Sequence, residues 1–347
     1  MQISYFLGTP TQNGYQNTLT PLIESGEYTT YILKGGPGTG KSSLMRKISA
    51  ELSQPDTEFY YCSSDPDSLD AVLFPTLKVI VIDGTSPHVV EPKNAGISEI
   101  LVDLGACWNR EVLLENKEVI LSASAENKAF HKTAGKYLTA VQSLNADIVA
   151  VAQKALLRKK LKGYSKRLCD KILPKRQKGE GKVLVKQLSA LTPKGLLHHT
   201  SLLYDCKVFT IQDPYHTACD TLLENIAITA QEKGFTVITG LNPLSNGSLY
   251  SCLVLPEIKV AFTSQPVENA VNINPMRFYD AKALKEKQQY LKFSSFVTKA
   301  ITNQLVSALS QAKAVHDTLE APYIKAMDFE KVNQIADKII NSIKQAE

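Results

Sequence analysis

The chain has 347 residues, of which 44% are hydrophobic and 21% are charged, and its formal net charge is +5. This is the composition of an ordinary soluble globular protein, and the length suffices for about two domains. The sequence has no run of 18 apolar residues and no basic-then-apolar N-terminus, so we expect neither a membrane span nor a signal peptide. The six scattered cysteines lack a C-x-x-C pair, which favours free thiols in a reducing cytoplasm over disulfides or zinc.

The first chemical motif runs from Gly35 to Ser42 and reads Gly-Gly-Pro-Gly-Thr-Gly-Lys-Ser. It matches the phosphate-binding (Walker A) pattern G-x-x-x-x-G-K-[ST]. We expect a buried strand before it, at 29–33, and a helix after it, at 41–52. A strand, a glycine loop and a helix in this order are the context that the pattern requires. The alternative is a glycine-rich turn that binds nothing.

The residue types of this loop suit a polyphosphate. Glycines tolerate positive φ and leave room for close approach, while loop N–H groups and the helix N-terminus attract phosphate oxygens. Lys41 is expected to reach the β- and γ-phosphates, and Ser42 to ligate Mg²⁺. The predicted phosphate-binding set is Gly35, Gly36, Pro37, Gly38, Thr39, Gly40, Lys41, Ser42 and Ser43.

A second metal ligand is expected at the end of a buried strand. The apolar run 79–82 is followed by Asp83, which pairs with Ser42 as the predicted magnesium site; the alternative is a turn residue that ends the strand. Gly84 comes next, where many motor ATPases carry a glutamate that activates water. Its absence favours phosphoryl transfer or a slow switch over a fast motor. Candidate sensors of the γ-phosphate follow, namely Thr85, Pro87 and His88.

Two further acids, Asp65 and Asp67, follow a strand expected at 58–62. Ligands of wound α/β folds lie beyond the carboxyl ends of the strands. We therefore expect one of these acids to position the attacking hydroxyl or water, so that Asp65, Asp67 and Lys41 form the predicted catalytic set. The alternative assigns both acids to the loop and to the cap of a following helix.

The alternation of strands and helices predicts an α/β fold, a P-loop NTPase fold with a wound parallel sheet and helical extensions in each half. The chain from 97 to 173 is expected to be mostly helical, with helices at 123–138 and 148–161. Residues 179–181, Gly-Glu-Gly, are the expected hinge or turn. Further strands are expected at 208–211, 235–239 and 259–263, followed by long helices to the end.

The chain is predicted to be one unit written twice. Segments 74–79 and 255–260 share the pattern of an apolar residue and a proline, then Lys-Val, and weaker matches lie elsewhere at offsets of 178 to 185 residues. One of the weaker matches pairs Lys128–His131 with Lys313–His316. We therefore predict a P-loop NTPase domain at 1–183 and a degenerate repeat at 184–347. The alternative is that the halves resemble each other only as α/β units.

The second half is predicted to have lost the nucleotide site. Ala218-Cys219-Asp220 stands where the first half has Gly40-Lys41-Ser42, and Ser264 stands at the position of Asp83. An acid without the lysine would repel a phosphate. We therefore expect one site for a nucleoside triphosphate and Mg²⁺ in the whole chain.

The segment 158–186 carries twelve basic residues and only two acidic ones. It could bind nucleic acid, but Tyr164 is its one aromatic residue for stacking. We therefore favour the solvated face of a helix and its exit loop.

These motifs resemble a family of duplicated bacterial P-loop ATPases, mostly uncharacterised and found especially in spore-forming Gram-positive lineages. Three segments carry the resemblance, 32–45, 62–70 and 77–88, and it spans nearly the full chain. It implies ATP as the nucleotide and its hydrolysis, without naming a second substrate. Family members often keep a phosphate loop in both halves, and this chain departs from that pattern.

The sequence therefore predicts a cytoplasmic, Mg²⁺-dependent ATPase with one site in its first half. Two alternatives stay open. One is a small-molecule or nucleotide kinase that uses the same site. The other is a nucleotide-gated binding module with negligible turnover, which would hold a partner through the basic segment 158–186.

Overall fold

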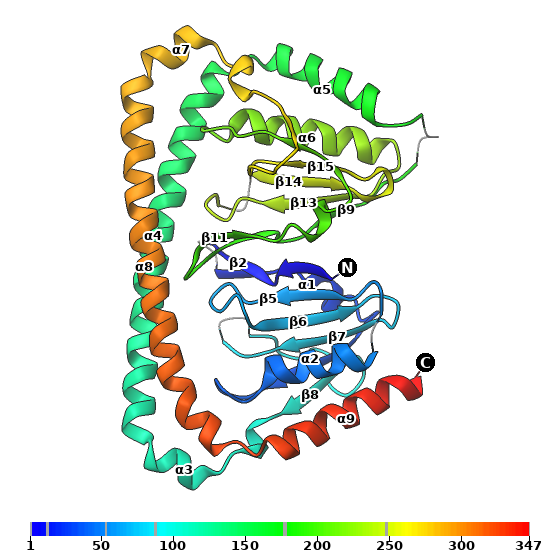
Figure 1. Ribbon diagram of the computed structural model, residues 1–347, viewed down its shortest axis with the longest axis vertical. Coiled ribbons are helices and arrows are strands. Elements are labelled where there is room, and N and C mark those ends of the chain that lie inside the picture. The colour runs from blue at the N-terminus through cyan, green and yellow to red at the C-terminus, as the bar shows by residue number, and fades with distance from the viewer. Residues whose placement is uncertain are drawn as a thin grey trace. The chain divides into compact units, whose positions relative to one another are not determined.

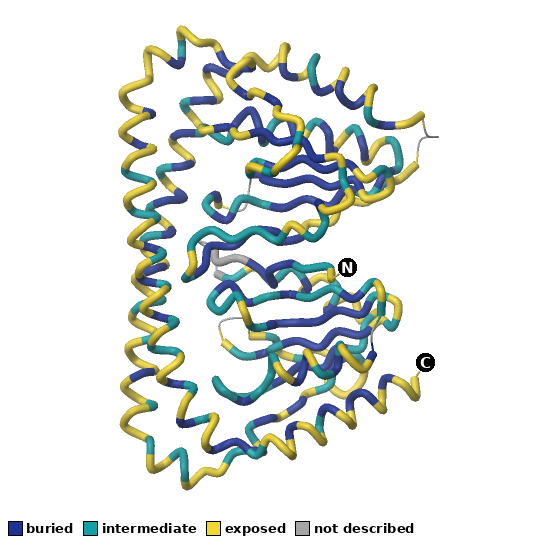
Figure 2. The backbone as a smooth tube through the Cα atoms, viewed as in Figure 1, coloured by how far each residue is buried: buried dark blue, intermediate teal, exposed yellow. Residues whose placement is uncertain are grey.

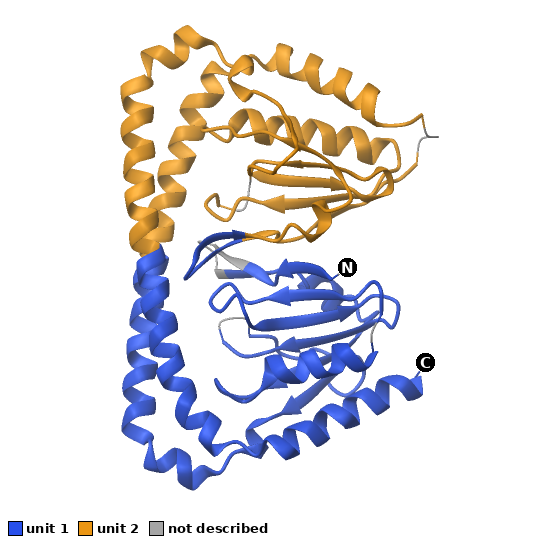
Figure 3. Ribbon diagram, in the orientation of Figure 1, with its two compact units in different colours: residues 1–135, 190–197, 306–347 blue, residues 136–189, 198–305 orange. Residues whose placement is uncertain are grey.

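The computed structural model describes residues 2–11, 14–52, 54–86, 89–175, 179–246 and 249–346. The chain groups into two compact units (Figure 3). Unit 1 comprises residues 1–135, 190–197 and 306–347, and unit 2 comprises residues 136–189 and 198–305. The boundary predicted at 183/184 separates two sequence repeats, whereas the two units are groups of residues in spatial contact. The predicted boundary therefore stays a prediction.

Unit 1 contains a mixed six-stranded sheet with the strand order β1-β5-β6-β7-β4-β8. β6 runs antiparallel to both neighbours, whereas the other pairs are parallel. The predicted parallel sheet is therefore mostly parallel, with β6 as the exception, because the turn after β5 is too short for a crossover and returns the chain as a hairpin. The strands are β1 (Ile3–Phe6), β4 (Thr29–Lys34), β5 (Glu58–Tyr61), β6 (Leu69–Phe74), β7 (Val79–Asp83) and β8 (Glu99–Asp103).

Two helices cover one face of this sheet, α2 (Lys41–Leu52) and α9 (Phe329–Ala346) (Figure 1). Their apolar side chains recur every three or four residues, as one buried helix face requires. They enter a single core with alternate residues of the strands; its members include Leu33, Leu44, Ile48, Val72, Val81, Val332 and Ile339. Every residue of β6 is buried (Figure 2). This core fixes the place at which α2 follows β4.

The remaining elements of unit 1 are short. They are the hairpin β2 (Gly8–Thr11) and β3 (Gly14–Asn17), α1 (Thr20–Glu24), the 3₁₀ turn η1 (Gly105–Cys107) and α3 (Arg110–Glu115). The division between the units falls inside two long helices of equal length, α4 (Lys117–Ala155) and α8 (Gln288–Ala326).

Unit 2 contains a second mixed sheet, with the order β16-β12-β15-β14-β13-β9. Here β14 is the antiparallel strand, between β13 and β15. The strands are β9 (Val183–Val185), β12 (Lys207–Thr210), β13 (Val237–Leu241), β14 (Tyr250–Leu255), β15 (Val260–Thr263) and β16 (Val271–Asn272). The helices and 3₁₀ turns are α5 (Arg158–Ile172), η2 (Ser201–Leu203), α6 (Thr217–Glu232), η3 (Pro256–Ile258), η4 (Pro275–Phe278) and α7 (Ala281–Glu286). A two-stranded sheet joins β10 (Ser189–Thr192) to β11 (Gly195–His198), and residues 190–197 of this hairpin belong to unit 1.

The two six-stranded sheets have the same order and directions, strand for strand. The match extends to individual residues. Lys78 and Lys259 both have φ of 51°, and each donates its N–H to a proline carbonyl three residues earlier. Each also accepts a hydrogen bond from the first residue of the neighbouring strand, β4 or β12. A lysine in the left-handed region is uncommon, so its recurrence marks these two turns as equivalent.

The ends of the long helices are also equivalent. Ala326 accepts a 2.8 Å hydrogen bond from Asn109 in unit 1, and Ala155 accepts one of the same length from Asp280 in unit 2. The sequence match of Lys128 with Lys313 is not an equivalence, because Lys128 lies in the first half of α4 and Lys313 in the second half of α8.

The helical prediction for 97–173 needs two corrections. Its first part is the strand β8, which pairs in parallel with β4. The helices predicted at 123–138 and 148–161 have wrong bounds, since α4 runs without a break from 117 to 155. The break follows it because Leu157 donates its N–H to Phe278 and not to its own helix.

The expected hinge at 179–181 belongs to unit 2. Gly181 donates to the carbonyl of Gln231, and a Cβ at Gly181 would meet the carbonyl oxygen of Phe235 at 2.3 Å. The strands predicted at 29–33, 58–62 and 79–82 and the helix at 41–52 are confirmed to within one residue. The strands predicted at 208–211, 235–239 and 259–263 are confirmed to within two residues. Among the described residues, no helix has the length and apolar character that crossing a membrane requires.

Candidate functional site

The segment 35–42, here called the glycine loop, connects the end of β4 to the start of α2. Gly38 and Gly40 have φ of +67° and +81°, which other residues rarely adopt. Thr39 is buried, and its hydroxyl donates to the carbonyl of Gly36. The loop therefore turns tightly at the positive end of the α2 dipole, where backbone N–H groups attract anions.

Lys41 bends back onto this loop. Its Nζ donates to the carbonyls of Gly35 and Gly36 at 3.2 and 2.8 Å, and it lies 3.5 Å from Oδ2 of Asp83. Only 11% of the Lys41 side chain and 14% of the Asp83 side chain are exposed. The structure thus brings together two predicted site residues that are far apart in the sequence.

Asp83 reaches the glycine loop because β7 pairs in parallel with β4, with Asp83 opposite Leu33. Its other oxygen, Oδ1, accepts hydrogen bonds from the N–H and the hydroxyl of Thr85. Ser42 accepts one from the N–H of Leu69, at 3.0 Å. A carboxylate and a hydroxyl are hard oxygen ligands of the kind that Mg²⁺ prefers, so these side chains have the chemistry for a metal-bound triphosphate.

Asp65 and Asp67 lie in the turn between β5 and β6. The structure contradicts their alternative role as helix caps, because a strand and not a helix follows. Oδ2 of Asp65 accepts from Ser68 and lies 3.7 Å from Nζ of Lys313 on α8. Asp67 is 77% exposed and pairs with Lys194, which holds the pKa of Asp67 below its usual value through a hydrogen bond and charge attraction. Asp65 therefore faces α8, and Asp67 faces Lys194 near solvent.

Glu320 on α8 contacts the glycine loop, and the sequence reasoning missed it. Its Oε1 accepts a hydrogen bond from the N–H of Gly38 at 3.2 Å. His316, one turn earlier, has Nδ1 3.9 Å from the same oxygen. No local signal marks this residue, because Glu320 lies 282 positions from Gly38 in an ordinary helical stretch.

The corresponding loop of unit 2 already holds an anion of its own. Asp213 is buried, and its Oδ2 accepts hydrogen bonds from the N–H groups of Ala218 and Cys219 and from the hydroxyl of Tyr279. Its Oδ1 accepts from Tyr215. A carboxylate of the same loop therefore fills the N-terminus of α6, whereas the glycine loop of unit 1 contains no acidic residue of its own.

Ser42 and Asp220 occupy equivalent places, as the sequence comparison proposed. Ser42 accepts a hydrogen bond from the first residue of β6, and Asp220 accepts one of 2.8 Å from Tyr250, the first residue of β14. Burial raises the pKa of Asp220 to about 6. By the same comparison Cys219, which is fully buried, replaces Lys41, so unit 2 lacks a cation at this position.

Trp108 lies beside the glycine loop. A Cβ at Gly36 would be 3.2 Å from its ring. Its indole N–H is buried and has no hydrogen-bond partner within the described ranges. Trp108 and Tyr279 form corresponding bridges in the two units, with Met327 and Leu156. Since Tyr279 donates to the internal anion of unit 2, Trp108 is a candidate donor to an anion in unit 1.

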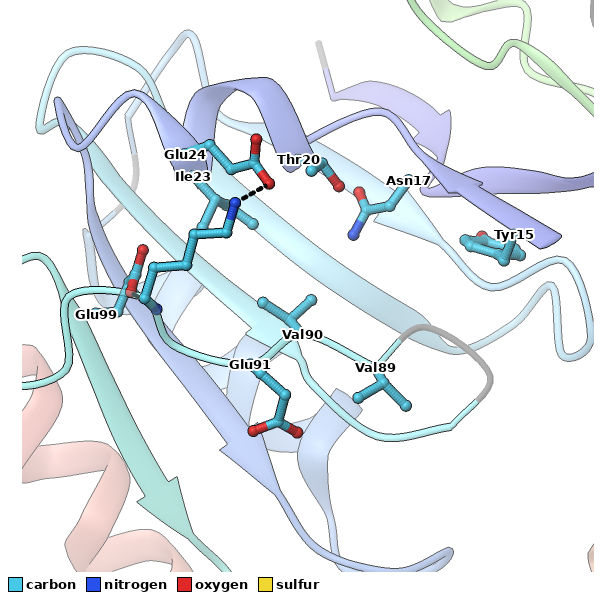
Figure 4. Close-up of a pocket in the computed structure, with 10 residues that line it drawn as sticks. Tyr15, Asn17, Thr20, Ile23, Glu24, Val89, Val90, Glu91 and Glu99 are labelled. Carbon is cyan, nitrogen blue, oxygen red and sulfur yellow. Dashed lines mark hydrogen bonds and ion pairs between the residues drawn. The ribbon is translucent and has the colours of Figure 1, made fainter. Parts of the chain in front are cut away.

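A separate pocket of about 410 Å³ lies beside the segment that follows Asp83 (Figure 4). It contains no residue of the glycine loop. Lys34 connects the two regions, because its Nζ donates to the carbonyl of Gly84 and to Glu91 in the pocket wall. The amide nitrogen of Asn17 points into the pocket and has no hydrogen-bond partner among the described residues. The lining residues are Tyr15, Asn17, Thr20, Ile23, Glu24, Val89, Val90, Glu91, Lys93 and Glu99.

The basic segment 158–186 includes α5, which turns its apolar residues toward α6 and its basic residues outward. Leu161, Leu168 and Cys169 are buried. The cations therefore form an exposed helix face. Two of the proposed γ-phosphate sensors, Pro87 and His88, lie outside the described residues.

Comparisons with models of protein families, with curated proteins and with solved structures found no match.

Proposed function

We propose that the chain is a Mg²⁺-dependent, ATP-binding P-loop NTPase of the cytoplasm that hydrolyses ATP at one site in unit 1. The observation that carries this proposal is the joining of Lys41, Asp83 and a positive-φ glycine loop at the start of α2. A Walker A sequence supported by this geometry is far more specific than the sequence alone. The choice of ATP over other triphosphates comes from the family resemblance.

In this proposal the residues have distinct roles. The loop N–H groups and Lys41 bind the phosphate oxygens, and Lys41 leaves the loop carbonyls to do so. Ser42 and Asp83 hold Mg²⁺, which neutralises charge on the phosphates. Asp65, which faces α8 across Lys313, positions the attacking water better than the exposed Asp67 does. Catalysis of this kind depends on positioning and on charge stabilisation.

We also infer that the two halves arose by duplication and that unit 2 has lost nucleotide binding. The equal strand order, the Lys78 and Lys259 turns and the equivalent helix ends support the duplication. Asp213 supports the loss, because a phosphate would have to displace a buried carboxylate that already accepts four hydrogen bonds.

Calorimetry with Mg²⁺ and a non-hydrolysable ATP analogue tests the proposal. We expect one molecule bound per chain, and Lys41→Ala should abolish binding. Lys47→Ala is the matched control, because Lys47 lies on the same helix but pairs with Asp337 of α9. Absence of binding by the wild-type chain, or two molecules per chain, would contradict the proposal.

A kinase that uses the same site is a second candidate, favoured by the pocket in Figure 4. The pocket is large enough for a small acceptor molecule. Lys34 contacts both Glu91 in the pocket wall and Gly84, which directly follows the proposed metal ligand Asp83. Free phosphate released without an acceptor indicates an ATPase. Turnover that depends on an added acceptor, with little free phosphate, indicates a kinase.

A further inference from the structure

The last turns of α8 pack directly on the glycine loop of unit 1. Glu320 accepts the N–H of Gly38, and Tyr323 lies where a side chain at Gly36 would project. A Cβ at Gly38 would be 2.9 Å from Ile324 and 3.0 Å from the carbonyl oxygen of Glu320. Because this contact is close, the Gly38 N–H cannot donate to Glu320 of α8 and to another anion at the same time.

The group that takes this N–H is itself an anion. Loop N–H groups at a helix N-terminus bind carboxylates and phosphates by the same charge-assisted hydrogen bonds. The Glu320 carboxylate therefore stands in the place of a phosphate oxygen. If both were present, two negative charges would compete for one donor.

The two units hold their internal carboxylates differently. Asp213 of unit 2 belongs to its own loop and is 6% exposed. Glu320 comes from a separate helix, its side chain is 31% exposed, and a single hydrogen bond of 3.2 Å joins it to the loop. The anion of unit 2 is thus a fixed part of the core, whereas the anion of unit 1 can be displaced.

The helix that carries Glu320 has a weak point nearby. Pro322 lies inside α8, and proline has no N–H to donate to the carbonyl four residues earlier. Such positions are where helices bend. Counted from the first residue of each helix, Glu320 and Pro322 correspond to Val149 and Val151 of α4. The acid and the proline are therefore particular to the helix end that faces the intact loop.

We propose that Glu320 is an internal competitor for the phosphate site, so that a nucleotide binds only when the end of α8 releases Gly38. This inference rests on the proposed nucleotide binding and adds its regulation. The displaced carboxylate has basic neighbours on its own helix, His316 one turn before it and Lys313 two turns before it.

The single tryptophan of the chain reports on this movement. Trp108 lies against Gly36, and its ring centroid is 5.5 Å from that of Tyr323. A Mg²⁺–ATP-analogue titration, followed by Trp108 fluorescence and by calorimetry, compares the wild-type chain with Glu320→Gln. We expect the variant to bind about tenfold more tightly, equivalent to about 1.4 kcal/mol. Glu320→Ala should shift the affinity in the same direction.

Asp317→Asn is the matched control, since Asp317 lies on the same helix, is 55% exposed and pairs with Lys313. Its affinity should equal that of the wild type. Equal or weaker binding by both Glu320 variants, with melting temperatures unchanged, would overturn the competitor role and leave the nucleotide site standing. If no form of the protein binds the analogue, the proposed function fails together with this inference.

Discussion

The Nζ atom of Lys41 lies 3.5 Å from Oδ2 of Asp83, although 42 positions separate the two residues in the chain. The positions that correspond to them in unit 2 hold Cys219 and Ser264. Unit 2 thus lacks both the lysine and the aspartate, as expected if the two residues act together in one binding site. The pair is therefore the first target for mutation.

Asp83→Asn should weaken Mg²⁺-dependent nucleotide binding and reduce turnover at least 100-fold, because the amide cannot supply the charge that holds the metal. Binding measured with and without Mg²⁺ should become nearly the same. Asp103→Asn is the matched control, since Asp103 ends β8 on the other side of β4 and is exposed. A metal dependence that survives in Asp83→Asn would contradict the assignment of Asp83.

Gly38→Ala should lower the free energy of unfolding by about 2–4 kcal/mol, because it combines a left-handed backbone with a collision against α8. Gly26→Ala separates the two effects. Gly26 has a similar φ of +69°, and nothing lies within 4 Å of its added Cβ. Gly26→Ala should lower the free energy of unfolding by only about 1 kcal/mol. Urea unfolding of both variants measures the difference, and equal losses would show that the packing against α8 is loose.

Asp213→Ala should destabilise the protein by about 3 kcal/mol or more, since it leaves the buried Cys219 N–H and the buried Tyr279 hydroxyl without their acceptor. Asp280→Ala is the comparison: Asp280 caps α7 at an exposed position and should cost about 1 kcal/mol. Asp213→Ala should not create a second nucleotide site, because Cys219 gives no cation there. Two bound nucleotides per chain in this variant would disprove that reasoning.

Asp220→Asn should stabilise the protein at pH 8 by about 2 kcal/mol and have little effect near pH 4. Burial raises the pKa of Asp220 from 3.8 to about 6, so the native state binds the proton more strongly than the unfolded chain. The contribution of this group to stability is therefore present below pH 4 and is lost as pH rises through 6. The amide keeps an oxygen for the Tyr250 N–H and removes the charge.

The difference between Asp220→Asn and the wild type across pH 4–8 isolates this group. His199 acts in the opposite direction, because burial lowers its pKa to about 4 and its contribution is lost as pH falls below 6.5. It affects both proteins equally. A difference in unfolding free energy that does not change between pH 4 and pH 8 would exclude a titrating Asp220.

The sequence predicted the parts of the site that depend on local patterns. The glycine loop, α2 and the place of Asp83 at a strand end follow from glycines, helical spacing and an apolar run, all within short segments. β6 was not predicted: the acids before it were expected to position the nucleophile, and the alternative placed a helix, not a strand, after them. Nothing in the chain before Leu69 shows that the next segment returns as an antiparallel strand.

Long-range contacts account for the rest. The proposed role of Glu320 and Pro322 becomes visible only in the packing of α8 on a loop about 280 residues away in the sequence. Sequence patterns assigned no role to Asp213. Its role as an internal anion depends on Tyr279, which arrives from a distant segment. Burial and partner identity of this kind have no signature in a single sequence.

Unit 1 can be assembled only after α9 has left the ribosome. Its core requires Val332, Ala336 and Ile339 of α9 against α2, which emerges about 280 residues earlier. At bacterial and eukaryotic translation rates this delay is roughly 15–60 s. During that interval α9 is not yet available to bury the apolar face of α2. We therefore expect chaperones to bind the nascent chains. A gene truncated after codon 183 should yield an insoluble product.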